Sequence, residues 1–68
     1  MSVYHARLAK GYTQKELAQR AGISERTVFA IENGYRHPSF ALLKKLAQAL
    51  DVPMKTLIPA AQIPDNKD

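Results

Sequence analysis

The residues with the widest chemical repertoire lie between Gln14 and Asn33, in the segment QKELAQRAGISERTVFAIEN. Its apolar spacing predicts two short helices joined by a tight turn at Gly22, where a residue without a Cβ avoids backbone strain. Once the apolar positions of both helices are assigned to a core, one face of the second helix is left over. That face carries charged, hydroxyl, amide and apolar side chains: Ser24, Glu25, Arg26, Thr27, Phe29, Ala30 and Asn33. Such a face can donate and accept hydrogen bonds and make apolar contacts with a partner.

Catalytic and metal chemistry have little support in the sequence. The chain has no cysteine, so it offers no thiolate nucleophile and no cysteine-based zinc site. Neither His5 nor His37 has a carboxylate at the spacing of a metal or acid–base pair, and no glycine-rich phosphate loop occurs. We therefore expect no enzyme activity, no cofactor, no metal site and no small-molecule substrate.

The positive charge is concentrated in the first two-thirds of the chain. Residues 1–45 contain eight Lys and Arg against three Glu, whereas residues 46–68 contain two Lys against three Asp. A basic field favours polyanions such as nucleic acid or an anionic membrane surface, although an ordinary soluble surface can also be basic. The first ten residues lack the apolar run of a secretory signal, and no stretch approaches a membrane span. We expect a cytoplasmic protein.

Sixty-eight residues allow one small domain, and no alternating apolar and polar run suggests a strand. Thr13 and Glu16 fit a capping box, while Ser24 and Ser39 fit N-caps. Glycine and proline divide the chain into five predicted helices, which run over 3–10, 13–21, 24–33 and 39–50 and for one or two turns after Pro53. The sequence therefore predicts an all-α fold.

The predicted helices have apolar stripes that can meet in one core. We expect the first helix to bury Val3, Ala6 and Ala9, and the short fifth helix to bury Leu57. The stripe of the fourth helix is expected to consist of Phe40, Leu43, Leu46, Ala47 and Leu50.

Taken together, these segments resemble the helix-turn-helix domain of the Cro and phage-repressor type, also called the xenobiotic-response-element type. Besides the segment 14–33, the similarity is carried by KGYTQKELA (10–18), IENG (31–34), HPSF (37–40) and LLKKLAQALDVP (42–53). It covers Val3 to about Ile58, with the small, glycine and apolar positions filled in register. The resemblance implies a compact five-helix bundle of the phage-repressor DNA-binding domain type over residues 1–58. Residues 59–68 read as a short flexible tail.

The resemblance also implies that the second helix crosses the DNA backbone and that the third lies in the major groove. Gln14 matches a phosphate-contacting position, although it can also be an ordinary exposed residue beside a cap. Positions that face bases are matched by Glu25, Arg26 and Ala30, and positions near the backbone or base edges by Ser24 and Thr27. Positions that approach the other phosphate strand are matched by Asn33, Tyr35, Arg36 and the backbone amides at Ser39 and Phe40.

The chemistry of two charged residues leaves alternatives open. Arg26 can donate two hydrogen bonds to a guanine, or it can reach a phosphate or remain in solvent. Glu25 can accept from a cytosine amino group or steer Arg26, or it can simply be favourable at a helix N-terminus.

Phe29 and Ala30 depart from the polar residues usual at their positions in this family. An apolar patch there can rest on thymine methyl groups. Alternatively, Phe29 packs against Gln14 or Tyr35 and never contacts a base. No operator sequence is predicted for this reason.

Arg7 and Glu32 match a pair that often forms an ion pair between the first helix and the end of the third, and we predict this contact. One recognition helix reads only a few base pairs, so we expect a homodimer on a palindromic operator with half-sites about 34 Å apart. The dimer surface is assigned to apolar residues that the predicted core does not need: Leu42, Met54, Ile58 and Ile63.

The function implied by the resemblance is a sequence-specific regulator of transcription that binds double-stranded DNA, with repression as the expected outcome. The same fold can instead serve as a protein-interaction module or an antitoxin-like regulator. The salt dependence of DNA binding separates these functions, because phosphate contacts release counterions.

Overall fold

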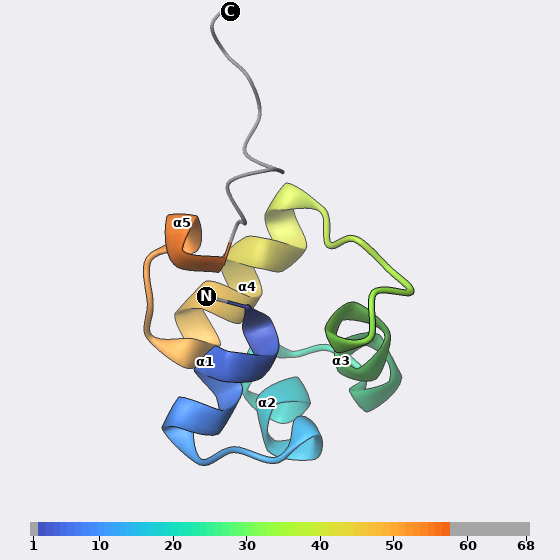
Figure 1. Ribbon diagram of the computed structural model, residues 1–68, viewed down its shortest axis with the longest axis horizontal. Helices are drawn as coiled ribbons and strands as arrows, with labels where there is room; N and C mark the ends of the chain where they lie inside the picture. The colour runs from blue at the N-terminus through green and yellow to red at the C-terminus, as the bar shows by residue number, and fades with distance from the viewer. Residues whose placement is uncertain (1, 58–68) are drawn as a thin grey trace, which may run out of the picture.

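The computed structural model describes residues 2–57, and these residues form five α-helices and no strand (Figure 1). The helices are α1 (Val3–Lys10), α2 (Gln14–Ala21), α3 (Glu25–Glu32), α4 (Phe40–Leu50) and α5 (Met54–Leu57). The all-α class and the order of the five helices are therefore confirmed. The predicted tail over 59–68 lies outside the described residues. Within 2–57 the longest helix has 11 residues, and none is both long and apolar enough to cross a bilayer.

Short polar side chains begin the first four helices. Ser2, Thr13, Ser24 and Ser39 each accept a hydrogen bond from the backbone N–H three residues later. At α2 the predicted capping box is complete, because the Glu16 carboxylate also accepts from the Thr13 N–H at 2.8 Å. These caps fix where the helices start independently of the core.

The chain leaves α2 and α4 through residues in the left-handed backbone region. Gly22 has φ 72°, a conformation in which a residue with a Cβ is strained. At the end of α4 this role falls to Asp51, with φ 57°, although the sequence offers no glycine there. Aspartate visits this region more readily than most residues because its short polar side chain can bond locally.

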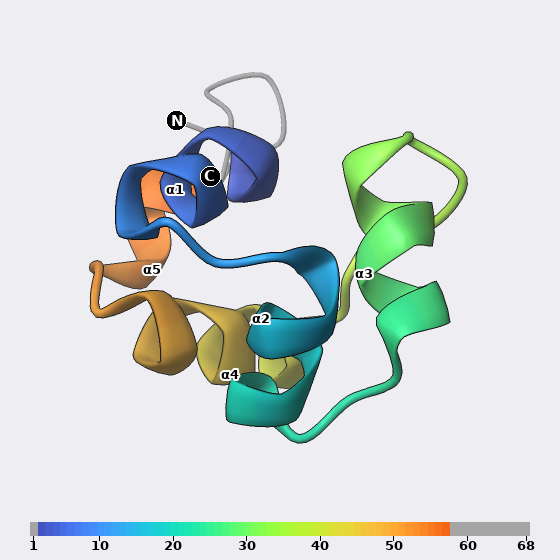
Figure 2. The same ribbon diagram turned by 90° about the horizontal axis from the view of Figure 1, so that it is seen from below.

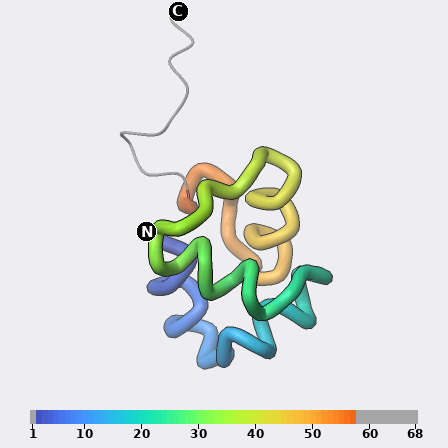
Figure 3. Tube along the Cα trace, turned by 90° about the vertical axis from the view of Figure 1, so that its right-hand side faces the viewer, coloured from blue at the N-terminus to red at the C-terminus, as the bar shows by residue number. Residues whose placement is uncertain are grey.

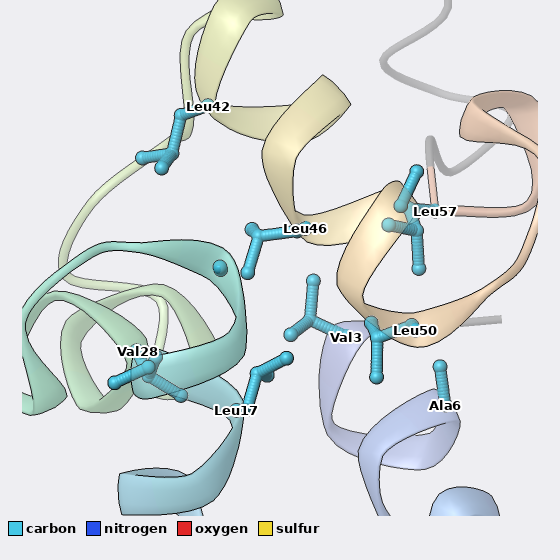
Figure 4. Close-up of a cluster of buried hydrophobic side chains, with 11 residues drawn as sticks. Val3, Ala6, Leu17, Val28, Leu42, Leu46, Leu50 and Leu57 are labelled. Atoms are coloured by element: carbon cyan, nitrogen blue, oxygen red, sulfur yellow. The ribbon is translucent and has the colours of Figure 1, made fainter.

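One core joins all five helices (Figure 4). Leu17 of α2, Val28 of α3, and Leu46 and Leu50 of α4 are the largest fully buried side chains. Full burial of a side chain of this size contributes about 1.5–3 kcal/mol to the stability of the folded state. Helix α4 packs against α1, α2 and α5, while α3 packs against α2 and, less extensively, against α1. The core therefore holds α3 through one side only, as the views from two directions show (Figure 1, Figure 2).

The start of α4 differs from the prediction. Phe40 was expected in the buried stripe but is 73% exposed, whereas Leu42, expected on a dimer surface, is 8% exposed and belongs to the core. Residues two positions apart in sequence lie about 200° apart around a helix axis. Phe40 and Leu42 therefore lie at opposite edges of the apolar stripe. The neighbouring helices cover the edge that carries Leu42. Ala9 is likewise exposed rather than buried.

Candidate nucleic-acid interface

Helix α3 stands at the edge of the molecule, and no other described segment covers its outer side (Figure 3). Its inner side is fixed by Val28, which is completely buried, and by Ile31, which is half-buried against the core. Glu25 and Arg26 are exposed on the same helix, while Ala30 is half-buried. The face left over by the core in the sequence is thus an outer face in the structure.

Several polar groups of this face form bonds within the protein. The hydroxyls of Ser24 and Thr27 are 2.8 Å apart, and the Ser24 hydroxyl also accepts from the Thr27 N–H. The Asn33 amide donates to the Phe29 carbonyl at 2.9 Å. Within residues 2–57, by contrast, no ion pair involves Glu25 or Arg26. Pairing of Glu25 with Arg26, one of the alternatives left open for Glu25, is therefore not seen in this part of the chain, and both residues are exposed.

The loop after α3 is fastened to the end of that helix. The Tyr35 N–H donates to the Ala30 carbonyl at 2.8 Å, and the Gly34 N–H donates to the Ile31 carbonyl at 3.3 Å. This pair of bonds closes a helix end when the intervening residue is left-handed, as Gly34 is with φ 79°. Tyr35 and Arg36 are both exposed, Tyr35 by 77%, and the Tyr35 ring lies 6.2 Å from that of Phe29 on α3.

A buried ion pair links α3 to α1. Arg7 donates from Nε to Glu32 Oε2 at 2.6 Å and from Nη2 to Oε1 at 3.1 Å, so the expected pair is present and bidentate. The third donor of Arg7, Nη1, bonds the Tyr12 carbonyl at 2.8 Å. The hydrogen bond to Glu32 raises the pKa of Arg7 and outweighs burial, which acts in the opposite direction. Arg7 therefore keeps its charge at every pH at which the domain would be studied.

Gln14 joins the same network. Its side-chain amide donates to Glu32 Oε1 at 2.9 Å, which connects the start of α2 to the end of α3. The sequence assigned this side chain to a phosphate or to solvent and gave no sign of the Glu32 contact. Two helices thus converge on the Glu32 carboxylate, α1 through Arg7 and α2 through Gln14. The segment between them joins the network through Arg7, which donates to the Tyr12 carbonyl.

The apolar residues assigned to a dimer surface do not form a patch in the described part of the chain. Leu42 is in the core, and Met54 is partly buried against it. Ile58 and Ile63 lie outside the described residues. The assignment of Leu42 to a dimer surface was wrong.

The helix-turn-helix family model matches residues 3–57, which includes all five helices. The chain belongs to the helix-turn-helix family of the Cro and phage-repressor type. The curated relatives that it matches are named HTH-type transcriptional regulators. The HTH-type transcriptional regulator SinR of Bacillus subtilis is 38% identical over 53 residues, which are 76% of this chain and 48% of SinR.

Other members of this helix-turn-helix family are similarly close. The uncharacterized HTH-type transcriptional regulator YazB of Bacillus subtilis is 40% identical over 78% of this chain and 77% of its own length. The crystal structure of the restriction-modification controller protein C.AhdI from Aeromonas hydrophila superposes with a TM-score of 0.76 and 36% identity. That match covers 78% of this chain and 80% of C.AhdI. For several curated relatives, however, this chain spans only 40–60% of their length.

Proposed function

We propose that this helix-turn-helix protein is a sequence-specific transcriptional regulator that binds double-stranded DNA with α3 in the major groove. The observation that carries the proposal is the outer face of α3, on which Glu25 and Arg26 are exposed while Val28 anchors the helix from behind. An α-helix with its side chains is about 10–12 Å wide, and the major groove of B-DNA is about 12 Å wide. The fit is therefore steric as well as chemical.

Arg26 is proposed as the main base reader. Its guanidinium can donate two parallel hydrogen bonds to O6 and N7 of a guanine. Glu25 is proposed to accept from a cytosine amino group beside it. Ala30 follows Arg26 by one helical turn, so it would lie against the base edges next along the groove.

Phosphate contacts are proposed for residues around this face. The loop after α3 and the start of α4 contribute side chains and backbone amides, and exposed amides at a helix start suit an anion. The residues proposed to contact the DNA backbone are Gln14, Ser24, Thr27, Asn33, Tyr35, Arg36 and Ser39. For Gln14 this contact requires its amide to share or leave the bond to Glu32.

The regulator is proposed to act as a homodimer on a palindromic operator, and in the cytoplasm. One α3 spans too few base pairs to select a site in a genome, whereas two copies read half-sites about 34 Å apart. An operator occupied in this way would exclude other proteins from the same DNA, which makes repression the proposed outcome. The proposed dimer surface retains Met54, Ile58 and Ile63 but not Leu42, which is buried in the core.

Selection of duplexes from a random DNA pool, followed by affinity measurements on an enriched duplex, tests the proposal. Arg26→Ala should weaken binding to that duplex by about 1–3 kcal/mol and binding to random DNA much less. Lys55→Ala is the control, because it also removes one positive charge but lies on α5, away from α3 (Figure 1). Equal losses for both variants would show that Arg26 does not read a base.

The salt dependence of the same affinity separates the proposed function from a protein-interaction module. A DNA-binding domain should lose affinity steeply as salt rises, with a slope that reports the number of phosphate contacts. The exposed rings of Tyr35 and Phe40, 77% and 73% exposed, are the observation that favours a protein partner instead. No enriched duplex and no salt-dependent DNA binding would support that alternative.

A further inference from the structure

Phe29 presents an aromatic ring that the core does not use. Its side chain is 48% exposed, although Val28 beside it in sequence is completely buried. Full burial of a phenylalanine contributes about 1.5–3 kcal/mol, and a half-exposed ring forgoes a large part of that. The buried core of residues 2–57 therefore gives no reason for a phenylalanine at this position.

The ring lies on the same face as the charged residues proposed to read bases. Phe29 follows Arg26 by three residues and Glu25 by four, and both spacings place side chains next to each other on a helix. Three residues advance about 4.5 Å along a helix axis, while one base step advances about 3.4 Å. A helix that follows the groove would therefore set Phe29 one base pair beyond the pair contacted by Arg26.

The loop after α3 supports the ring from one side. The ring centroids of Phe29 and Tyr35 are 6.2 Å apart with the planes tilted by 46°. The backbone bond from Tyr35 to Ala30 and the side-chain bond from Asn33 to the Phe29 carbonyl hold this loop against α3. The contact with Tyr35, foreseen as one alternative, leaves about half of the Phe29 ring open.

We infer that Phe29 determines specificity by contacting the C5-methyl group of a pyrimidine, in thymine or in 5-methylcytosine; this rests on the proposed function. The methyl group is the apolar feature that base edges present in the major groove. The other edge groups there are hydrogen-bond donors and acceptors, and a ring packed on them would desolvate them without replacing their bonds. Phe29 thus favours a methylated pyrimidine next to the guanine of Arg26 and disfavours other bases.

The test removes the methyl group without changing any hydrogen-bonding group. In a duplex enriched from the random pool, each thymine of one half-site is replaced in turn by uracil. Burial of one methyl-sized group corresponds to about 0.8 kcal/mol, so we expect about a fourfold loss of affinity at one position. Phe29→Ala should bind the thymine and uracil duplexes equally, and Tyr35→Ala should keep the difference.

The responsive thymine is then replaced by cytosine and by 5-methylcytosine, which again differ by one methyl group. About a fourfold gain for 5-methylcytosine supports contact with the methyl group in either base, and no gain overturns that half of the inference. Circular dichroism checks that the Phe29 and Tyr35 variants fold.

A parent protein that ignores every uracil substitution, or a Phe29→Ala variant that keeps the fourfold difference, would overturn the inference and leave the proposed function intact. Loss of the difference in Tyr35→Ala alone would transfer the contact to Tyr35 and overturn the assignment to Phe29. If no duplex is enriched at all, the proposed function fails and the inference fails with it.

Discussion

The carboxylate of Glu32 offers the most quantitative test of how α3 is held. Replacement by Met removes its charge and both acceptors but keeps an unbranched side chain of similar length. The side chains of Arg7 and Glu32 are 10% and 3% exposed, so Glu32→Met leaves a buried guanidinium without its counter-ion. Breaking a buried pair by removing one partner costs about 3–5 kcal/mol. Because Arg7 keeps its bond to the Tyr12 carbonyl, we expect the lower end, about 3 kcal/mol.

Urea unfolding followed by circular dichroism measures this loss. A domain of 68 residues has a total stability of only about 3–10 kcal/mol, and 1 kcal/mol corresponds to about 4–8 °C in Tm. Glu25→Met is the matched control, since it makes the same change on the same helix at an exposed position. It should change the unfolding free energy by about 0.5 kcal/mol or less.

A double variant, Arg7→Met with Glu32→Met, completes the cycle. Apolar side chains of similar volume often replace a buried ion pair with little loss, so the double variant should be more stable than Glu32→Met alone. Equal unfolding midpoints for Glu32→Met and Glu25→Met would refute the reasoning. So would a double variant whose loss equals the sum of its two single losses.

Three further changes test the local structure. Gly22→Val should destabilise the domain by about 1–2 kcal/mol. A Cβ there would meet no atom within 4 Å, so the cost comes from the strained left-handed backbone and not from a clash; an unchanged melting temperature would contradict the turn. Thr13→Ala should cost about 1 kcal/mol in urea unfolding because it removes the capping box of α2, and a loss below 0.3 kcal/mol would show that the cap is dispensable. Leu42→Ala should cost about 2 kcal/mol or more and Phe40→Ser less than about 0.5 kcal/mol; the reverse order would restore the original expectation for α4.

Most of the fold could be predicted from interactions between residues close together in the sequence. The hydroxyl caps at Thr13, Ser24 and Ser39 and the glycine at 22 act over three or four residues, so their effect can be read without knowing the tertiary structure. The errors at Phe40 and Leu42 arose where a helix offers two edges of an apolar stripe. Which edge is covered depends on the neighbouring helices, and that is a long-range property.

Only part of the candidate site could be predicted, because some of its contacts depend on how distant segments pack. The outer face of α3 followed from subtracting the core positions, and the Arg7–Glu32 contact followed from the family resemblance. The bonds from Gln14 to Glu32 and from Arg7 to the Tyr12 carbonyl have no local signature, because each joins segments brought together only by the fold. The left-handed Asp51 could have been suspected from Pro53, since proline is common shortly after a helix end.

The central claim is that the outer face of α3 contacts DNA. A titration of 15N-labelled protein with an enriched duplex, followed by NMR, tests it residue by residue. The account predicts that the largest amide shifts fall between Ser24 and Arg36, with small changes in α5. Shifts confined to α1 and α5, with residues 24–36 unchanged at saturation, would contradict it.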